Sequence, residues 1–185
     1  MSARNRISFE TVGSIVAIVV GVVALFVAWD EAKSVRKQQA ASVLPIVKIF
    51  TSYTTTEMGH KSAVIVQNVG VGPAFIENAR IIWDGTQLQD VRSGLAVLPG
   101  ANDLVEIWTS PLYGEIMSGN DEYEMFSAIM PSEKVTAEYI SSLKTSINRN
   151  LIIEACFCSV YEECWTTNLN STIRPQPIKS CAADF

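Results

Sequence analysis

The sequence is nearly devoid of histidine, since His60 is the only one in 185 residues. Serine and cysteine hydrolases place an imidazole beside the nucleophile, and a zinc-protease helix needs two of them. His60 begins a predicted strand after a turn, where we expect a solvated side chain. We therefore predict that the protein is not an enzyme. Two carboxylates converging in one cleft remain the catalytic alternative.

Motifs that bind cofactors are also missing. No phosphate loop occurs, and residues 70–73 read G-V-G-P, in which the proline prevents the helix that a dinucleotide fingerprint requires. The acidic residues Asp121, Glu122 and Glu124 lack the alternating spacing of a calcium loop. We expect no cofactor and no metal ion, with the three carboxylates solvated.

Basic residues are scarce after residue 43. Residues 44–185 carry nine Lys or Arg and sixteen Asp or Glu, a net charge of −7, whereas residues 1–43 have a net charge of +2. A domain with this charge repels phosphate groups. Nucleic acid and anionic lipid are therefore not expected as its main ligands, and the sequence leaves any small-molecule ligand unspecified.

One long stretch has no charge at all. Residues 11–29 form a run of 19 uncharged residues between Glu10 and Asp30. As a helix the run reaches about 28 Å, close to the hydrocarbon thickness of a bilayer. A cleaved signal peptide is the rival interpretation, but the run is longer than a usual apolar region and no small-residue cleavage site follows. We predict one transmembrane helix after a short tail at residues 1–10.

Small residues line one face of this predicted span. Gly13, Ala17 and Gly21 recur every fourth residue, a spacing that lets another helix approach closely. We expect these residues to pack against other membrane protein subunits, although such a spacing also arises by chance. Trp29 suits the membrane interface, and residues 30–43 favour a helical stem that ends before Pro45.

Residues 44–168 show the pattern of a β domain. Short runs of β-branched and aromatic residues alternate with turns rich in Gly, Pro, Asn and Asp. A helix is predicted at 133–148, capped by Ser132, because apolar residues recur there at spacings of three and four. The fold class that this pattern predicts is mainly β: an immunoglobulin-like β-sandwich with one inserted helix. The predicted strands are 46–53, 60–69, 75–83, 87–91, 104–109 and 125–129, with a hairpin at 151–165 and turns at 54–59 and 98–100.

The segment 110–124 contains proline, glycine and four carboxylates. Its composition predicts an exposed loop. The apolar residues within it offer a docking surface for another protein. These residues are Leu112, Tyr113, Ile116 and Met117.

All four cysteines fall in the last thirty residues: Cys156, Cys158, Cys164 and Cys181. Three disulfide pairings are possible. We favour Cys158–Cys164 across the hairpin with Cys156–Cys181 fixing the tail at residues 169–185. Buried free thiols and a metal site are the alternatives, but the spacing fits no common zinc motif.

Disulfides require an oxidising compartment. They predict a cytoplasmic N-terminus and a C-terminal domain on the far side of the membrane. The Lys and Arg residues near the ends of the span number two before it and three after it. This count is indecisive and leans slightly towards the opposite orientation.

Two motifs together resemble those of a loose group of uncharacterised bacterial proteins. The motifs are N-V-G-V-G-P-A at 68–74 and C-S-V-Y-E-E-C-W at 158–165. Proteins of this group pair one N-terminal membrane helix with a β-sandwich domain, and the resemblance covers about residues 10–168. It implies a protein of the bacterial inner membrane with a periplasmic domain. Both motifs are structural turns, so no site residue is implied.

These observations predict a membrane-anchored accessory subunit of a larger complex, or an interaction module, without enzymatic activity. The alternative is the ectodomain of a ligand-binding sensor or receptor. An apolar pocket within the β-sandwich would favour this alternative.

Overall fold

A computed structural model describes residues 9–89 and 100–181. The chain divides into two compact units, residues 1–42 and residues 43–185. The predicted strand at 87–91 and turn at 98–100 lie partly outside the described residues, as does most of the predicted N-terminal tail.

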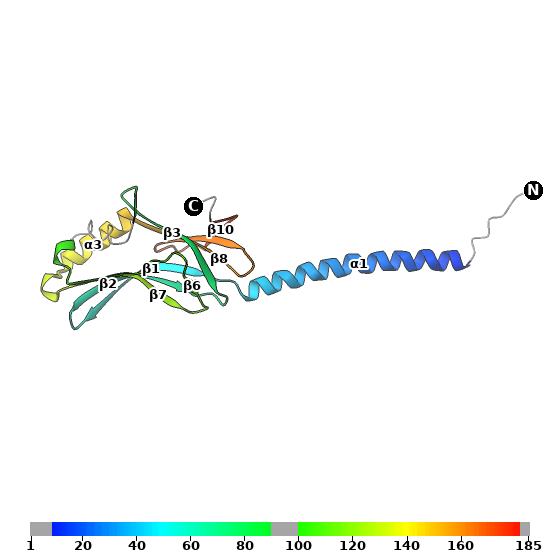
Figure 1. The fold of residues 1–185 in the computed structure, drawn as a ribbon, viewed down its shortest axis with the longest axis horizontal. Coiled ribbons are helices and arrows are strands. Elements are labelled where there is room, and N and C mark those ends of the chain that lie inside the picture. Colours follow the sequence, from blue (N-terminus) through cyan, green and yellow to red (C-terminus); the bar gives the residue numbers. More distant parts are fainter. Residues whose placement is uncertain (1–8, 90–99, 182–185) are drawn as a thin grey trace, which may run out of the picture. The chain divides into compact units, whose positions relative to one another are not determined.

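The described residues of the first unit form a single helix, α1, which spans Phe9–Ser42 (Figure 1). It joins the predicted span and the predicted stem without a break. None of its residues is buried, and its apolar side chains are spread around the helix instead of forming one stripe. It is one helix that is long and apolar enough to cross a membrane.

The second unit contains two antiparallel β-sheets. Sheet A has the strand order β1-β2-β7-β5. Sheet B has the order β10-β9-β8-β3-β4, and the short strand β6 pairs with the start of β3. The bounds in sheet A are β1 Val47–Thr56, β2 Gly59–Asn68, β5 Glu106–Thr109 and β7 Glu122–Met130. Those in sheet B are β3 Ala74–Trp83, β4 Thr86–Leu88, β6 Ile116–Met117, β8 Leu151–Cys158, β9 Cys164–Asn168 and β10 Gln176–Ile178.

The two sheets share one hydrophobic core. Alternate residues of each strand face the same side of a sheet, and the inward residues of both sheets belong to one cluster of buried side chains. Val47 and Val66 contribute from sheet A, and Ile153 and Phe157 from sheet B; all four have a relative exposure of 0%. An N-terminal apolar helix followed by β-sheets is confirmed.

One helix inserted before β8 is also confirmed, but its predicted start was wrong. Helix α3 spans Ala137–Asn150, and its N-cap is Thr136, whose hydroxyl accepts a hydrogen bond from the Tyr139 amide at 3.1 Å. Ser132 instead begins a short 3₁₀ helix, η2, at Ser132–Lys134; another, η1, spans Ala101–Asp103. Leu143 of α3 is buried in the core.

Several boundaries in the β region also differ from prediction. Strand β7 begins at Glu122, inside the predicted loop 110–124, and not at residue 125. Strand β1 continues through Thr56 and pairs there with Gly59, so the predicted turn at 54–59 shrinks to residues 57–58. Threonine suits a strand as well as a turn, which explains the error. The tail, for which no element was predicted, forms β10 along β9 because pairing with a neighbouring strand can order even three residues.

Asn68, at the end of β2, holds together the end of the domain where β1 begins. Its relative exposure is 0%. The side-chain oxygen accepts hydrogen bonds from the amides of Ile46 at 3.1 Å and Gly70 at 3.0 Å. The side-chain nitrogen donates to the carbonyl oxygens of Gly72 at 2.8 Å and Met117 at 3.1 Å. One side chain therefore links β1, the β2–β3 turn and β6.

The β2–β3 turn needs glycine at positions 70 and 72 because a side chain there would overlap neighbouring backbone atoms. A Cβ at Gly72 would lie 1.8 Å from the carbonyl oxygen of Val43, and a Cβ at Gly70 would lie 2.4 Å from that of Leu44. Neither glycine has a positive φ. The turn therefore needs glycine because two backbone segments touch, and not because of a left-handed conformation.

Asn68→Ala is expected to lower the free energy of unfolding by about 3 kcal/mol, because buried backbone donors and acceptors lose their partners. Urea unfolding of the full-length protein in mild detergent, followed by tryptophan fluorescence, measures the change. Asn148→Ala, at an exposed position of α3, is the control and should change the stability by less than about 0.5 kcal/mol. Equal losses in both variants would contradict the role of Asn68.

On the outer face of sheet A, the Lys61 ammonium lies 2.6 Å from the Glu124 carboxylate. Burial acts to raise the pKa of Glu124, but hydrogen bonds from Lys61 and Ser127 and the charge of Lys61 together lower it. A lowered folded-state pKa stabilises the fold above the ordinary carboxyl pKa. This stabilisation is lost as the pH falls through the lowered value.

Glu124→Gln should therefore destabilise the protein near neutral pH and become nearly neutral in acid. Both side chains are 29% exposed, so the effect at neutral pH should stay below about 1 kcal/mol. Unfolding curves of the variant and the wild type at about pH 7 and about pH 2.5 test this. An unchanged difference between the two proteins at both pH values would refute it.

Candidate functional site

Three connections meet at the end of the domain where β1 begins, which we call the entry end. They are the β2–β3 turn at 69–73, the segment 113–121 and the β8–β9 turn at 159–163. The Val69 amide donates to the Ile46 carbonyl at 2.8 Å, and the Asn120 amide donates to the Asn68 carbonyl at 2.8 Å. The entry end is therefore a hydrogen-bonded framework that presents its side chains in fixed positions.

Five apolar side chains of this framework are at least half exposed. Their relative exposures range from 50% to 77%. In sheet B, Phe75 of β3 lies between Ile116 of β6 and Cys158 of β8, which places the segment 113–121 and the β8–β9 turn on either side of β3. We call these five residues the entry-end surface: Val71, Tyr113, Ile116, Val160 and Tyr161.

The predicted docking loop is only partly exposed. Tyr113 and Ile116 are 70% and 63% exposed, but Leu112 and Met117 are both 3% exposed and belong to the core. The prediction was wrong for these two residues. Met117 pairs with the buried Ala74 and shares its inward face, whereas Ile116, one residue earlier, faces outwards. A two-residue strand that the sequence does not reveal thus decides which side chains are available.

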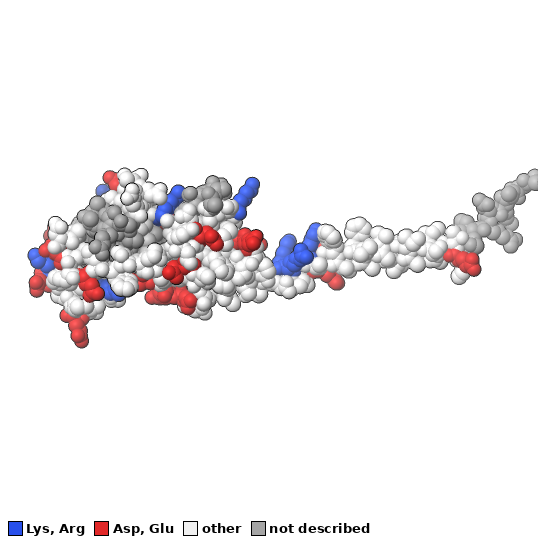
Figure 2. All heavy atoms as spheres, viewed as in Figure 1, with Lys and Arg blue, Asp and Glu red and all other residues white. Residues whose placement is uncertain are grey.

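Acidic residues outnumber basic ones in the segments that carry the entry-end surface, although Lys179 shares a groove with Tyr113 and Glu162. Figure 2 shows more acidic than basic side chains on the visible face of the domain, while a long part of α1 carries no charge. The Asp121 carboxylate accepts a hydrogen bond from the Ser118 amide at 2.8 Å and fixes its own loop. The acidic residues at this end are Glu77, Glu115, Asp121, Glu122, Glu162 and Glu163.

Two disulfides lie beside this surface on the outer face of sheet B. They join Cys156 to Cys181 and Cys158 to Cys164, the pairing that we favoured from the sequence. Cys158 and Cys164 face each other across the β8–β9 pair, at the base of the 159–163 turn. The turn is also closed by its own backbone, since the Ser159 amide donates to the Glu163 carbonyl at 2.8 Å.

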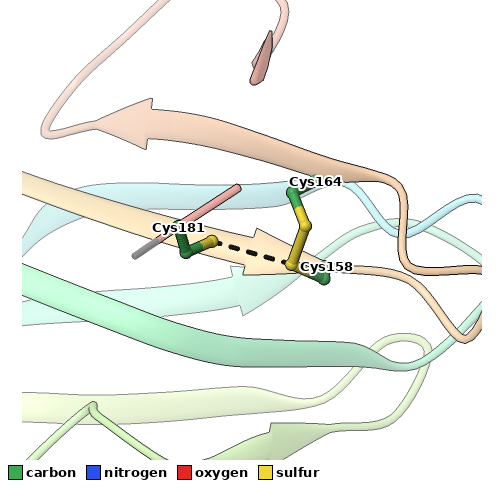
Figure 3. Close-up of side chains that lie close together, drawn as sticks. All are labelled: Cys158, Cys164 and Cys181. Atoms are coloured by element: carbon green, nitrogen blue, oxygen red, sulfur yellow. Dashed lines mark hydrogen bonds between the residues drawn. A yellow bond between two sulfur atoms is a disulfide. The ribbon is translucent and has the colours of Figure 1, made fainter. Parts of the chain in front are cut away.

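The cysteine sulfurs converge, but they are not a metal centre in this state. The Sγ atoms of Cys158, Cys164 and Cys181 all lie within 4.8 Å of one another (Figure 3). A metal ion requires thiolates, and every cysteine of the chain is in a disulfide. The cluster is therefore a covalent clamp that holds the tail to β8.

The other residues singled out from the sequence are not part of the entry-end surface. A Cβ added at Gly13 or Gly21 of α1 would meet no atom of the described residues within 4 Å, and Ala17 lies between these glycines. His60 is in the β1–β2 hairpin, with its Nδ1 atom 3.2 Å from the Thr55 hydroxyl. Whether the small residues of α1 pack against another helix stays a prediction.

Sequence reasoning missed Val71, Val160 and Tyr161 as exposed residues. Apolar residues at the tips of turns are the signal that could have found them, because turn tips lie on the surface. Val71 is at the β2–β3 turn, and Val160 and Tyr161 are at the β8–β9 turn. The sequence motifs identify both turns only as structural connections.

One apolar helix followed by a disulfide-bonded domain of two antiparallel sheets defines the class of this protein. The chain belongs to the family described as Domain of unknown function (DUF8453), whose model matches residues 11–161. The match includes most of α1 and the domain as far as the β8–β9 turn. A comparison with curated proteins gives no match.

The two disulfides should differ in their contribution to stability. Cys156 and Cys181 are separated by 25 residues and Cys158 and Cys164 by 6, and a longer closed loop restricts the unfolded chain more. Replacing Cys156 and Cys181 by alanine should cost about 3.5 kcal/mol, against about 2 kcal/mol for Cys158 and Cys164. Urea unfolding of the two double variants without reductant tests this order, and the reverse order would disprove it.

Proposed function

We propose that this protein is a membrane-anchored, non-enzymatic accessory subunit or interaction module of a larger membrane protein complex. The observation that carries the proposal is the entry-end surface, where five exposed apolar side chains sit on a rigid framework. Exposed apolar groups held in place lose little conformational freedom on binding. Such a surface favours recognition of another protein.

The proposed anchor is α1, with the N-terminus in the bacterial cytoplasm and the domain in the periplasm. Its length and hydropathy support a span. Two disulfides support an oxidising compartment for the domain. The Lys33 ammonium lies 5.6 Å from the Trp29 ring centre, which suits the membrane interface, where aromatic and basic side chains gather.

We also propose that the domain is an immunoglobulin-like β-sandwich. The order β1-β2-β7-β5 corresponds to strands A-B-E-D of that fold, and β9-β8-β3-β4 corresponds to G-F-C-C′. The short strand β6 and helix α3 are then insertions, and β10 is an addition beside strand G. Immunoglobulin-like domains present their loops at the two ends of the sandwich, as the entry end does here.

The receptor alternative has less support. A drug-sized ligand occupies a pocket of about 300–1,000 Å³. The cavity between sheet A and helix α3, lined by residues such as Phe126 and Leu143, has a volume of about 30 Å³, enough for about one water molecule. Open grooves of about 530 and 500 Å³ on the described surface fall within that range, so the receptor alternative rests on these grooves and not on a cavity between sheet A and α3.

The direct test is extraction of the full-length protein from native membranes in mild detergent, followed by native electrophoresis and mass spectrometry of the band. We expect co-migration with other membrane proteins in a fixed ratio. Migration alone, as a monomer or homo-oligomer, would argue against an accessory subunit and would shift support to the receptor alternative.

Single charge insertions then test the surface itself. Val71→Asp and Ile116→Asp should each lower the recovery of the partner at least about tenfold, because a charge enters an apolar contact. Val105→Asp and Ile173→Asp are matched controls, since both residues are similarly exposed, at 60% and 72%, and lie outside the entry-end surface. Equal losses in all four variants would show that this surface is not the contact.

A further inference from the structure

We propose that Cys158 is a thiol-exchange site: a dithiol from solvent opens the Cys158–Cys164 disulfide, and Cys158 then exchanges into the Cys156–Cys181 disulfide. The two disulfides would thus form one reactive unit. The proposal does not depend on which partner the protein binds, because it concerns covalent bonds within the chain.

The four sulfurs differ in their access to solvent. Cys156 is 0% exposed, Cys181 6% and Cys164 9%, whereas Cys158 is only partly buried. Thiol–disulfide exchange requires that an attacking thiolate reach a sulfur atom. Cys158 is therefore the most exposed of the four cysteine residues, and the proposal is that an incoming thiol attacks there first.

A groove leads to this sulfur. It is lined by Phe75, Glu77 and Val160, with a volume of about 390 Å³. A second groove of about 500 Å³, lined by Tyr113 and Lys179, also reaches Cys158, and it borders Cys164 and Cys181 as well. The apolar and charged groups beside the sulfur allow a small dithiol or an extended peptide thiol to approach it.

The two disulfides are in direct contact. The Sγ atoms of Cys158 and Cys181 lie 3.6 Å apart, along the dashed line in Figure 3. Both sulfurs are disulfide-bonded and carry no hydrogen, so this is a van der Waals contact and not a hydrogen bond. A thiolate released at Cys158 already touches the sulfur that it would attack.

Each step of the exchange conserves atoms and electrons. One thiolate of the dithiol attacks Cys158 and releases the Cys164 thiolate, which takes a proton. The second thiolate closes the reductant as a disulfide and releases the Cys158 thiolate, so the dithiol is oxidised and the Cys158–Cys164 bond is reduced. The Cys158 thiolate then attacks Cys181, the Cys181–Cys156 bond breaks, and the Cys156 thiolate leaves and is protonated.

When the Cys158–Cys164 disulfide opens, hydrogen bonds within the 159–163 turn still support that turn. The Glu162 amide donates to the Ser159 carbonyl at 3.0 Å, and the Tyr161 amide donates to the Ser159 hydroxyl at 3.2 Å. Cys181 exchanges between two sulfur partners on the same face of β8, two residues apart. The exchange therefore moves the point at which the tail is attached, next to Val160 and Tyr161 of the entry-end surface.

Limited reduction of the full-length wild type in detergent with dithiothreitol, trapping with N-ethylmaleimide and peptide mapping by mass spectrometry provide the test. We expect Cys158 and Cys164 to be alkylated first, with Cys156–Cys181 intact, at least about tenfold faster than any other pair. A Cys158–Cys181 linkage with alkylated Cys156 and Cys164 should follow. Opening of Cys156–Cys181 first, or at the same rate, would overturn the proposal.

Two single variants isolate the sulfur contact. Cys164→Ser leaves Cys158 as a thiol beside an intact disulfide and should give both Cys156–Cys181 and Cys158–Cys181 linkages without any reductant. Cys158→Ser leaves Cys164 as the thiol and should give at least about tenfold less Cys164–Cys181 linkage. A Cys158–Cys181 linkage below about 1% in the first variant, or equal exchange in both variants, would refute the role of the contact.

Discussion

The buried amide of Asn68 is the interaction on which the entry end of the domain depends. Buried backbone groups must find hydrogen-bond partners, and in an irregular turn a strand ladder cannot supply them. Asn68 provides an acceptor to two amides and a donor to the carbonyls of Gly72 and Met117. The positions of Val71 and Ile116 follow from it, because each lies one residue from a group that Asn68 holds.

The sequence predicts local structure well and long-range pairing poorly. The main strands, the helix before β8 and the Cys158–Cys164 bond rest on patterns within a few residues of each other. Leu112 and Met117 were assigned to the surface because their segment is polar overall, yet pairing of Met117 with the distant Ala74 turns it inwards. No local pattern encodes that register. The space required at Gly70 and Gly72 is likewise visible only when residues 43–44 lie against them.

The entry-end segments combine exposed apolar residues with an excess of carboxylates. Clustered apolar groups on a surface promote unwanted association, and a net negative charge opposes self-association by repulsion between copies. A partner with basic and apolar groups would satisfy both features. This combination distinguishes the entry-end surface from isolated exposed residues such as Ile173, which need no special explanation.

The placement of the disulfides indicates a local role. A domain of about 140 residues can bury enough apolar surface to fold around its core without covalent bonds. The cysteines form a cluster of their own on the outer face of sheet B, apart from the core shared by the two sheets. Their direct structural effect therefore falls on the tail and on the 159–163 turn, the turn that carries Val160 and Tyr161. A change in the sulfur bonds would then act on the tail and on this turn of the entry-end surface before it reached the core shared by the two sheets.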